Sequence, residues 1–95
     1  MPVTGISGSP GSQQFWKLAV PAGRPSVTFT IGGGSGDADL YVRYGARPTT
    51  STWTCRPYLK GNSEACTITN PQDGDWFVMI RGHSPFNGVT LNGQY

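Results

Sequence analysis

The sequence predicts a single all-β domain, built as an antiparallel β-sandwich. Short segments alternate apolar and polar residues, turn-forming residues separate them, and no stretch of ten residues has the apolar spacing of an amphipathic helix. The 95 residues include 14 glycines and 8 prolines, and 13% are charged, against about 25% in an average domain. This composition is typical of a loop-rich extracellular β-domain, and it argues against a helical bundle or a disordered acidic tail.

Five segments carry the strand pattern most clearly. Within residues 26–31, for example, Val27, Phe29 and Ile31 alternate with Ser and Thr. The expected strands are 14–20, 26–31, 39–44, 75–81 and 89–95, with shorter strands near 53–55 and in 66–69. Residues 45–64 are expected to form a long loop, and residues 1–10 a flexible linker remnant, within one domain that covers 1–95.

The two cysteines, Cys55 and Cys66, enclose ten residues. In a small, glycine-rich chain with few charges, one disulfide is favoured over two free thiols. A zinc site is disfavoured because it requires four ligands and His83 is the only histidine. The disulfide predicts an oxidising compartment, either the periplasm or the outside of the cell.

Charge and hydropathy patterning argue against nucleic acid and membrane partners. The formal net charge is +2, and the seven basic residues are scattered, so no basic stripe is available to follow a nucleic acid backbone. No run of about 18 apolar residues is present, so no membrane span is expected. No signal peptide follows Met1, and we expect the natural protein to be longer. We expect the domain to be a monomer.

The most specific motif is Gly-Asp-Ala-Asp-Leu-Tyr-Val at residues 36–42. It is accompanied by Val20-Pro21-Ala22-Gly23, by the pair Cys55 and Cys66, and by Gly74-Asp75-Trp76. In this order the motifs closely resemble the bacterial pre-peptidase C-terminal domain, from about Gly8 to Tyr95. The resemblance implies a jelly-roll-like β-sandwich at the C-terminal end of secreted bacterial serine or metallopeptidases. It also implies a non-catalytic domain that is often removed after secretion, with relatives in collagenases that bind collagen and calcium.

No set of residues has the pattern of a catalytic site. His83 is the one candidate histidine base, and its Gly-His-Ser-Pro loop has no Gly-x-Ser-x-Gly elbow. Asp37 and Asp39 are too close in sequence to act as the two carboxylates of a glycosidase. The glycines at 32–36 lack the Gly-Lys-Ser/Thr of a phosphate loop, and a strand follows them. The sequence therefore predicts an accessory domain rather than an enzyme.

Two Asp-x-Asp pairs are candidate calcium sites. Asp37 and Asp39 flank a glycine-rich turn, where carboxylates and loop carbonyls would supply oxygen ligands. Asp73 and Asp75 form a weaker candidate across a glycine. The alternative is structural, with Asp37 capping the turn and Asp39 accepting hydrogen bonds from its neighbours. We expect no required cofactor, with calcium at Asp37 and Asp39 as the open alternative.

Two strands suggest a ligand-binding face. If Leu40, Val42, Val78 and Ile80 fill the core, the residues between them point outward. The candidate ligand-binding residues are Tyr41, Arg43, Phe77, Met79 and Arg81, extended by Trp53 and Tyr58 from the long loop. Aromatic and arginine side chains are enriched at binding sites. Alternatively, the loop 45–64 or the parent enzyme covers this face, or both faces of the sheet are buried. An error of one residue in the alternation would exchange the faces.

These observations predict a non-catalytic C-terminal accessory domain of a secreted bacterial peptidase. It would bind the enzyme to an insoluble protein such as collagen. One alternative is a secretion, folding or processing element that is cleaved off during maturation. Another is a carbohydrate-binding module for a polymer such as chitin, in which Trp53 and Trp76 would stack on sugar rings, although the pattern of its strand favours a core position for Trp76. The expected partners are the parent peptidase domain and collagen or another insoluble polymer, and the expected location is extracellular.

Overall fold

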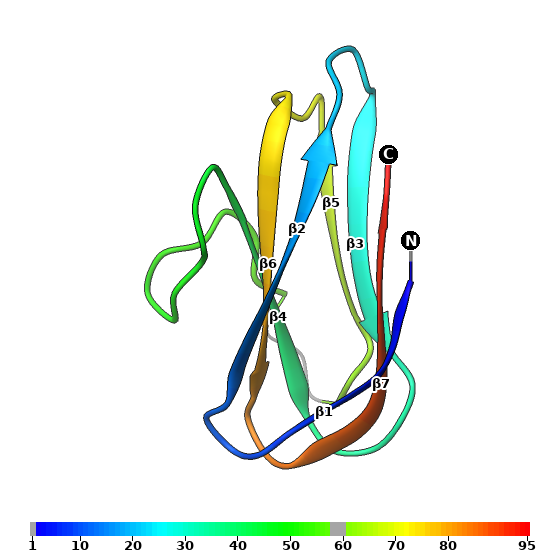
Figure 1. The fold of residues 1–95 in the computed structure, drawn as a ribbon, viewed down its shortest axis with the longest axis vertical. Coiled ribbons are helices and arrows are strands. Elements are labelled where there is room, and N and C mark those ends of the chain that lie inside the picture. Colours follow the sequence, from blue (N-terminus) through cyan, green and yellow to red (C-terminus); the bar gives the residue numbers. More distant parts are fainter. Residues whose placement is uncertain (1, 58–60) are drawn as a thin grey trace.

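Two antiparallel sheets pack face to face in the computed structural model, which describes residues 2–57 and 61–95 (Figure 1). One sheet has the strand order β1 (Val3–Gly8), β7 (Phe86–Gln94), β3 (Ser26–Gly32) and β5 (Glu64–Thr69). The other has the order β2 (Gln13–Val20), β6 (Gly74–Gly82) and β4 (Ala38–Tyr44). The prediction of an all-β antiparallel sandwich is confirmed.

The core lies between the two sheets and is filled by alternate residues of the strands. Val27, Phe29 and Ile31 of β3 are buried in it, as the alternation predicts. Trp76 of β6 is also buried there, and its indole N–H donates a hydrogen bond to the carbonyl of Gln72 at 2.9 Å. Trp76 is therefore a core residue and is not placed to stack on a sugar ring.

The N-terminal segment differs from its prediction. Residues 1–10 are expected to be a flexible linker, but they contain β1, which pairs with β7 at the other end of the chain. Ile6 is 5% exposed and belongs to the core. Two register shifts interrupt the pairing, and Gly5 has a φ of 68°. An irregular strand of this kind lacks the alternation that identifies a strand from sequence.

Two element boundaries also differ. The short strand predicted near 53–55 is a single β-bridge between Val42 and Cys55. β7 begins at Phe86 rather than at residue 89. The predicted disulfide between Cys55 and Cys66 is confirmed, and it joins the segment beside β4 to β5.

The glycine-rich turn before β4 packs against the turn that precedes β7. Ser35 and Asn87 exchange two backbone hydrogen bonds, of 2.9 and 3.0 Å. Gly34 and Gly36 have φ values of 67° and 97°. A Cβ at Gly34 would collide with the carbonyl of Asn87, and one at Gly36 with the carbonyl of Pro85. These glycines therefore permit a close backbone approach.

The free edge of β4 is covered by hydrogen bonds along its length. The amide of Ala38 donates to Asn62 Oδ1 at 2.8 Å, Leu40 to Glu64 Oε1 at 2.7 Å, Val42 to the Cys55 carbonyl at 2.9 Å, and Tyr44 to Thr54 Oγ1 at 3.3 Å. An unpaired strand edge is a template for association with another chain. Here the edge is closed by Asn62 and Glu64 at one end of β4 and by Thr54 and Cys55 at the other.

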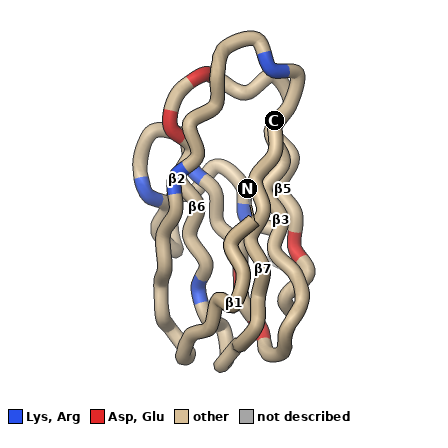
Figure 2. The backbone as a smooth tube through the Cα atoms, turned by 45° about the vertical axis from the view of Figure 1, so that its right-hand side comes forward, with Lys and Arg blue, Asp and Glu red and all other residues tan. Residues whose placement is uncertain are grey.

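Charged residues are sparse on this framework. Figure 2 shows them scattered over both sheets and their connections, without a stripe of basic residues in the described part of the chain. No helix of the described residues is long and apolar enough to cross a membrane.

We predict that the disulfide contributes about 2.5–3 kcal/mol to the free energy of unfolding, because it closes a loop with a sequence separation of 11. The double variant Cys55→Ser, Cys66→Ser should lose that amount in urea unfolding at neutral pH. Reduction of the wild-type domain should give the same loss. Equal unfolding midpoints for the oxidised and reduced wild type would contradict the prediction.

Candidate functional site

The outer face of the three-stranded sheet holds the predicted aromatic and arginine residues. β4 and β6 are neighbours, and Tyr41 lies opposite Met79 and Arg43 opposite Phe77. The intervening residues Leu40, Val42, Val78 and Ile80 are in the core. The predicted division of these strands into an inner and an outer face is therefore confirmed.

A loop covers the β4 side of this outer face. Tyr41 is 1% exposed and Met79 is 0% exposed. The guanidinium carbon of Arg56 lies 4.8 Å from the centroid of the Tyr41 ring, a cation–π contact, and Pro48 of the same loop is fully buried. The alternative that the loop 45–64 covers this face thus applies to its β4 side. Ligand contact by Tyr41 or Met79 would require the loop to move.

The other predicted ligand-binding residues that the structure describes are less buried. Arg43, Phe77 and Arg81 are half-buried, and Trp53 is exposed at 44%. Tyr58 lies outside the described residues. A role in ligand binding stays a prediction for all seven residues.

A shallow hollow is open on the β2 side of the same face. It has a volume of about 240 Å³ and is lined by Phe15, Trp16, Lys17, Arg47 and Phe77, and we call it the Phe15–Phe77 hollow. The Arg47 guanidinium carbon lies 4.6 Å from the centroid of the Phe15 ring. The Arg43 side chain donates a hydrogen bond to the Arg47 carbonyl at 3.2 Å and so holds this part of the loop over β2.

Two cations therefore stand beside two aromatic rings. Lys17 Nζ lies 3.8 Å from Asp75 Oδ2, but both side chains are about half exposed, so this pair contributes little to stability. The sequence prediction does not include Phe15, Lys17 or Arg47. The alternation within 14–20 places Phe15 and Lys17 opposite the core-facing Trp16 and Leu18, but their position beside Phe77 depends on the pairing of β2 with β6.

The candidate calcium ligands occupy different environments. Asp39 is 2% exposed and Asp37 is half-buried, and one carboxylate oxygen of each is buried without a hydrogen-bond partner. Burial raises the pKa of Asp39, and the neighbouring Asp37 raises it further. A hydrogen bond with Glu64 and the charges of His83 and Arg56 act in the opposite direction. Within the described residues, no group of three or more His, Cys, Asp or Glu side chains is arranged to hold a metal ion.

The remaining polar candidates lie at the surface. Asp73 and Asp75 are exposed; the Asp73 carbonyl accepts a hydrogen bond from the Tyr44 hydroxyl at 2.7 Å, and Asp75 pairs with Lys17. His83 is exposed, and its backbone N–H donates to the Asp37 carbonyl at 3.0 Å. The contacts of Asp73 and His83 are those of turn residues, whereas Asp75 lies in β6 and its ion pair joins β6 to β2.

We predict that Asp39 makes the domain less stable as the pH rises above about 4. The pKa of Asp39 in the folded state is raised above its ordinary value of 3.8, so in this window the folded state binds more protons than the unfolded state. The free energy of unfolding therefore falls with rising pH. Urea unfolding across this range should show that slope in the wild type and in Asp75→Asn, and a flatter one in Asp39→Asn. Identical slopes in all three proteins would exclude Asp39 as the cause.

The comparisons with known proteins agree with this fold. Residues 12–82 match the family model described as the bacterial pre-peptidase C-terminal domain. The chain is 46% identical over its whole length to alkaline serine exoprotease A of Vibrio alginolyticus, and 50% identical over 95% of its length to a zinc metalloprotease of Helicobacter pylori. It spans 18% and 35% of the lengths of these relatives.

A solved structure shows the same architecture. The solution structure of vEP C-ter 100 superposes with a TM-score of 0.79 at 45% sequence identity, covering 99% of this chain and 92% of that one. The resemblance drawn from the sequence motifs is confirmed by the family match and by these relatives. The chain therefore belongs to the bacterial pre-peptidase C-terminal domain family, a small accessory domain found in secreted bacterial proteases.

Proposed function

We propose that this domain is a non-catalytic tether that holds a secreted peptidase on an insoluble protein polymer such as collagen. The observation that supports the proposal best is the Phe15–Phe77 hollow, where the side chains of Lys17 and Arg47 border two aromatic rings on an accessible sheet face. Aromatic rings contribute contact area at a low cost in conformational entropy, and cationic side chains donate hydrogen bonds.

The chemistry of this surface suits a polyproline-type chain. Proline-rich extended chains dock on aromatic-lined grooves, and their backbone carbonyls remain available to donors such as arginine. From the sequence prediction we include two further residues in this surface: Trp53, which is exposed on the loop, and Arg43 of β4, which donates to the Arg47 carbonyl. In this proposal Tyr41 and Met79 act indirectly, because they form the buried support on which that loop rests.

We expect tethering to be independent of calcium. The unpartnered carboxylate oxygens of Asp37 and Asp39 would suit a cation, but the charges of Arg56 and His83 already act on Asp39. Loss of polymer retention in a chelator would instead assign calcium to these two aspartates.

We predict that the oxidised domain is retained on insoluble collagen, and that Phe77→Ala reduces retention about tenfold, the effect of removing a central contact residue. Tyr95→Ala is a matched control, because Tyr95 is 49% exposed and lies at the end of the other sheet. Retention is measured by pull-down, with chitin and cellulose in parallel.

Two outcomes would overturn the proposal. Selective retention on chitin or cellulose would indicate a carbohydrate-binding module. Absence of retention on all three polymers, together with poor secretion of a parent protease that lacks the domain, would indicate an export or processing element.

A further inference from the structure

On the side away from β6, the backbone of β2 pairs with no other strand of residues 2–57 and 61–95. On β4, the amides of the even-numbered residues 38 to 44 point away from β6, so the residues between them bond β6. The odd-numbered residues of β4 pair with residues 77, 79 and 81 of β6, so the backbone groups of these three β6 residues face β4. The backbone groups of residues 76, 78 and 80 therefore face β2. These three pair with residues 18, 16 and 14. The amides and carbonyls of Phe15, Lys17 and Ala19 therefore point to the open side.

The two edges of this sheet thus differ. On the edge formed by β4, four amides donate hydrogen bonds to residues beyond the sheet. By contrast, β2 pairs continuously with β6 over eight residues, and no backbone hydrogen bond to another strand is found for it among the described residues. β2 contains no proline, and Lys17 is its only charged residue. A regular, unprotected edge of this length favours the addition of an extended chain.

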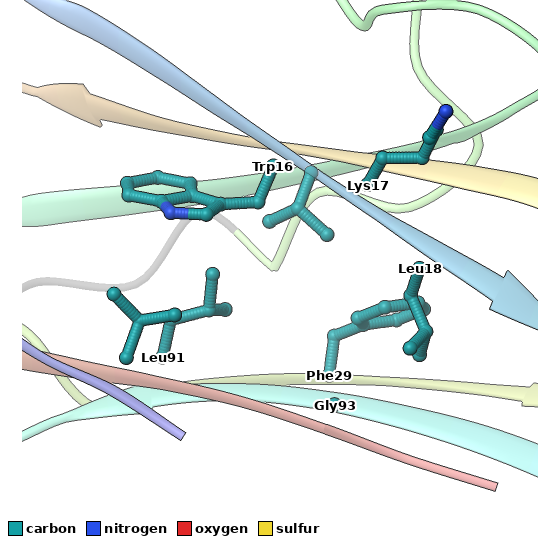
Figure 3. Close-up of a pocket in the computed structure, with 8 residues that line it drawn as sticks. Trp16, Lys17, Leu18, Phe29, Leu91 and Gly93 are labelled. Carbon is teal, nitrogen blue, oxygen red and sulfur yellow. The ribbon is translucent and has the colours of Figure 1, made fainter. Parts of the chain in front are cut away.

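An apolar pocket opens on the inner side of the same edge. It lies between β2 and β7, has a volume of about 90 Å³, and we call it the Trp16–Leu91 pocket. In Figure 3, Trp16 and Leu18 point into the gap towards Leu91 and Phe29, whereas Lys17 points away. A cavity of about 150 Å³ holds a benzene molecule, so this pocket has room for one aliphatic side chain.

Gly93 keeps this pocket open. A Cβ at Gly93 would lie 3.1 Å from Leu18 Cδ2 and 3.3 Å from Phe29 Cδ1, so a larger side chain there would enter the space between them. The φ of Gly93 is not in the left-handed region, so the backbone itself does not require glycine.

The Phe15–Phe77 hollow lies on the outer side of the same strand. Successive side chains of an added strand point to opposite faces of the sheet, so one would enter the Trp16–Leu91 pocket and the next the hollow. Lys17 and Arg47 border the hollow, and an acidic side chain complements them. We propose that β2 binds an extended peptide segment of a partner protein by strand addition, with aliphatic side chains in the pocket alternating with acidic side chains in the hollow.

The charges argue against a second copy of this domain as the occupant. Pairing of two β2 edges would place the Lys17 side chains of both copies on adjoining strands, with the Arg47 side chain of each loop beside the same hollow, and like charges there repel. Strand addition can also be distinguished from polymer tethering, although both use the Phe15–Phe77 hollow. Collagen has a polyproline-type backbone that does not pair with a β-strand, so only the added peptide depends on the β2 amides.

The test is titration of the ¹⁵N-labelled domain with a decapeptide in which valine alternates with glutamate. We expect shift changes centred on β2, and slowed amide exchange at Phe15, Lys17 and Ala19 in the complex. Ala19→Pro removes one outward amide while the pairing with β6 is kept, and should weaken binding at least about tenfold. Ala19→Ser is the matched control that retains the amide and should bind like the wild type.

Two further variants keep the test decisive. Gly93→Val fills the pocket and should also weaken binding. A peptide N-methylated at the alternate amides that face β2 should fail to bind the wild type, and this test holds even if Ala19→Pro proves unfolded. Unchanged affinity for the methylated peptide or for a folded Ala19→Pro domain would overturn the inference. So would dimerisation of the free domain through β2. Collagen retention should be unchanged by Ala19→Pro, so failure of either proposal is recognised separately.

Discussion

The hydrogen bonds that cover the free edge of β4 determine which parts of this domain remain accessible. Asn62 and Glu64 satisfy the amides at one end of the edge, and Thr54 and Cys55 satisfy those at the other. The disulfide ties Cys55 to β5, so Thr54 and Cys55 stay beside β4. Arg56, the next residue, stacks on the Tyr41 ring on the outer face of the sheet, where Tyr41 and Met79 are buried.

The accessible surface is consequently displaced towards β2. On this side, Arg47 is the loop residue that stacks on the Phe15 ring, and Phe15, Lys17 and Phe77 line a hollow beside it. The same strand ends the smaller sheet, so its outward amides and the pocket beside Trp16 and Leu18 are also open. One strand therefore presents an aromatic and cationic hollow, a row of backbone donors and acceptors, and an apolar pocket. This concentration of recognition chemistry on one strand supports a binding role for the domain.

The sequence predicts those parts of the structure that depend on local alternation. Val27, Phe29 and Ile31 identify β3, and the alternation of β4 correctly separates Leu40 from Tyr41. It cannot show that Tyr41 is covered, because the covering contact with Arg56 joins residues brought together by the disulfide loop. β1 escapes prediction for a similar reason, since its glycines interrupt the pattern and its pairing with β7 is long-range. Arg47 joins the hollow through tertiary packing alone.

Native-state amide hydrogen exchange distinguishes the covered edge of β4 from the open edge of β2. We expect slow exchange for Ala38, Leu40 and Val42, whose amides are bonded beyond the sheet. On β2 we expect an alternation, with slow exchange at Trp16 and Leu18 and fast exchange at Phe15, Lys17 and Ala19. Uniform protection along β2, or fast exchange at Leu40, would contradict this distinction.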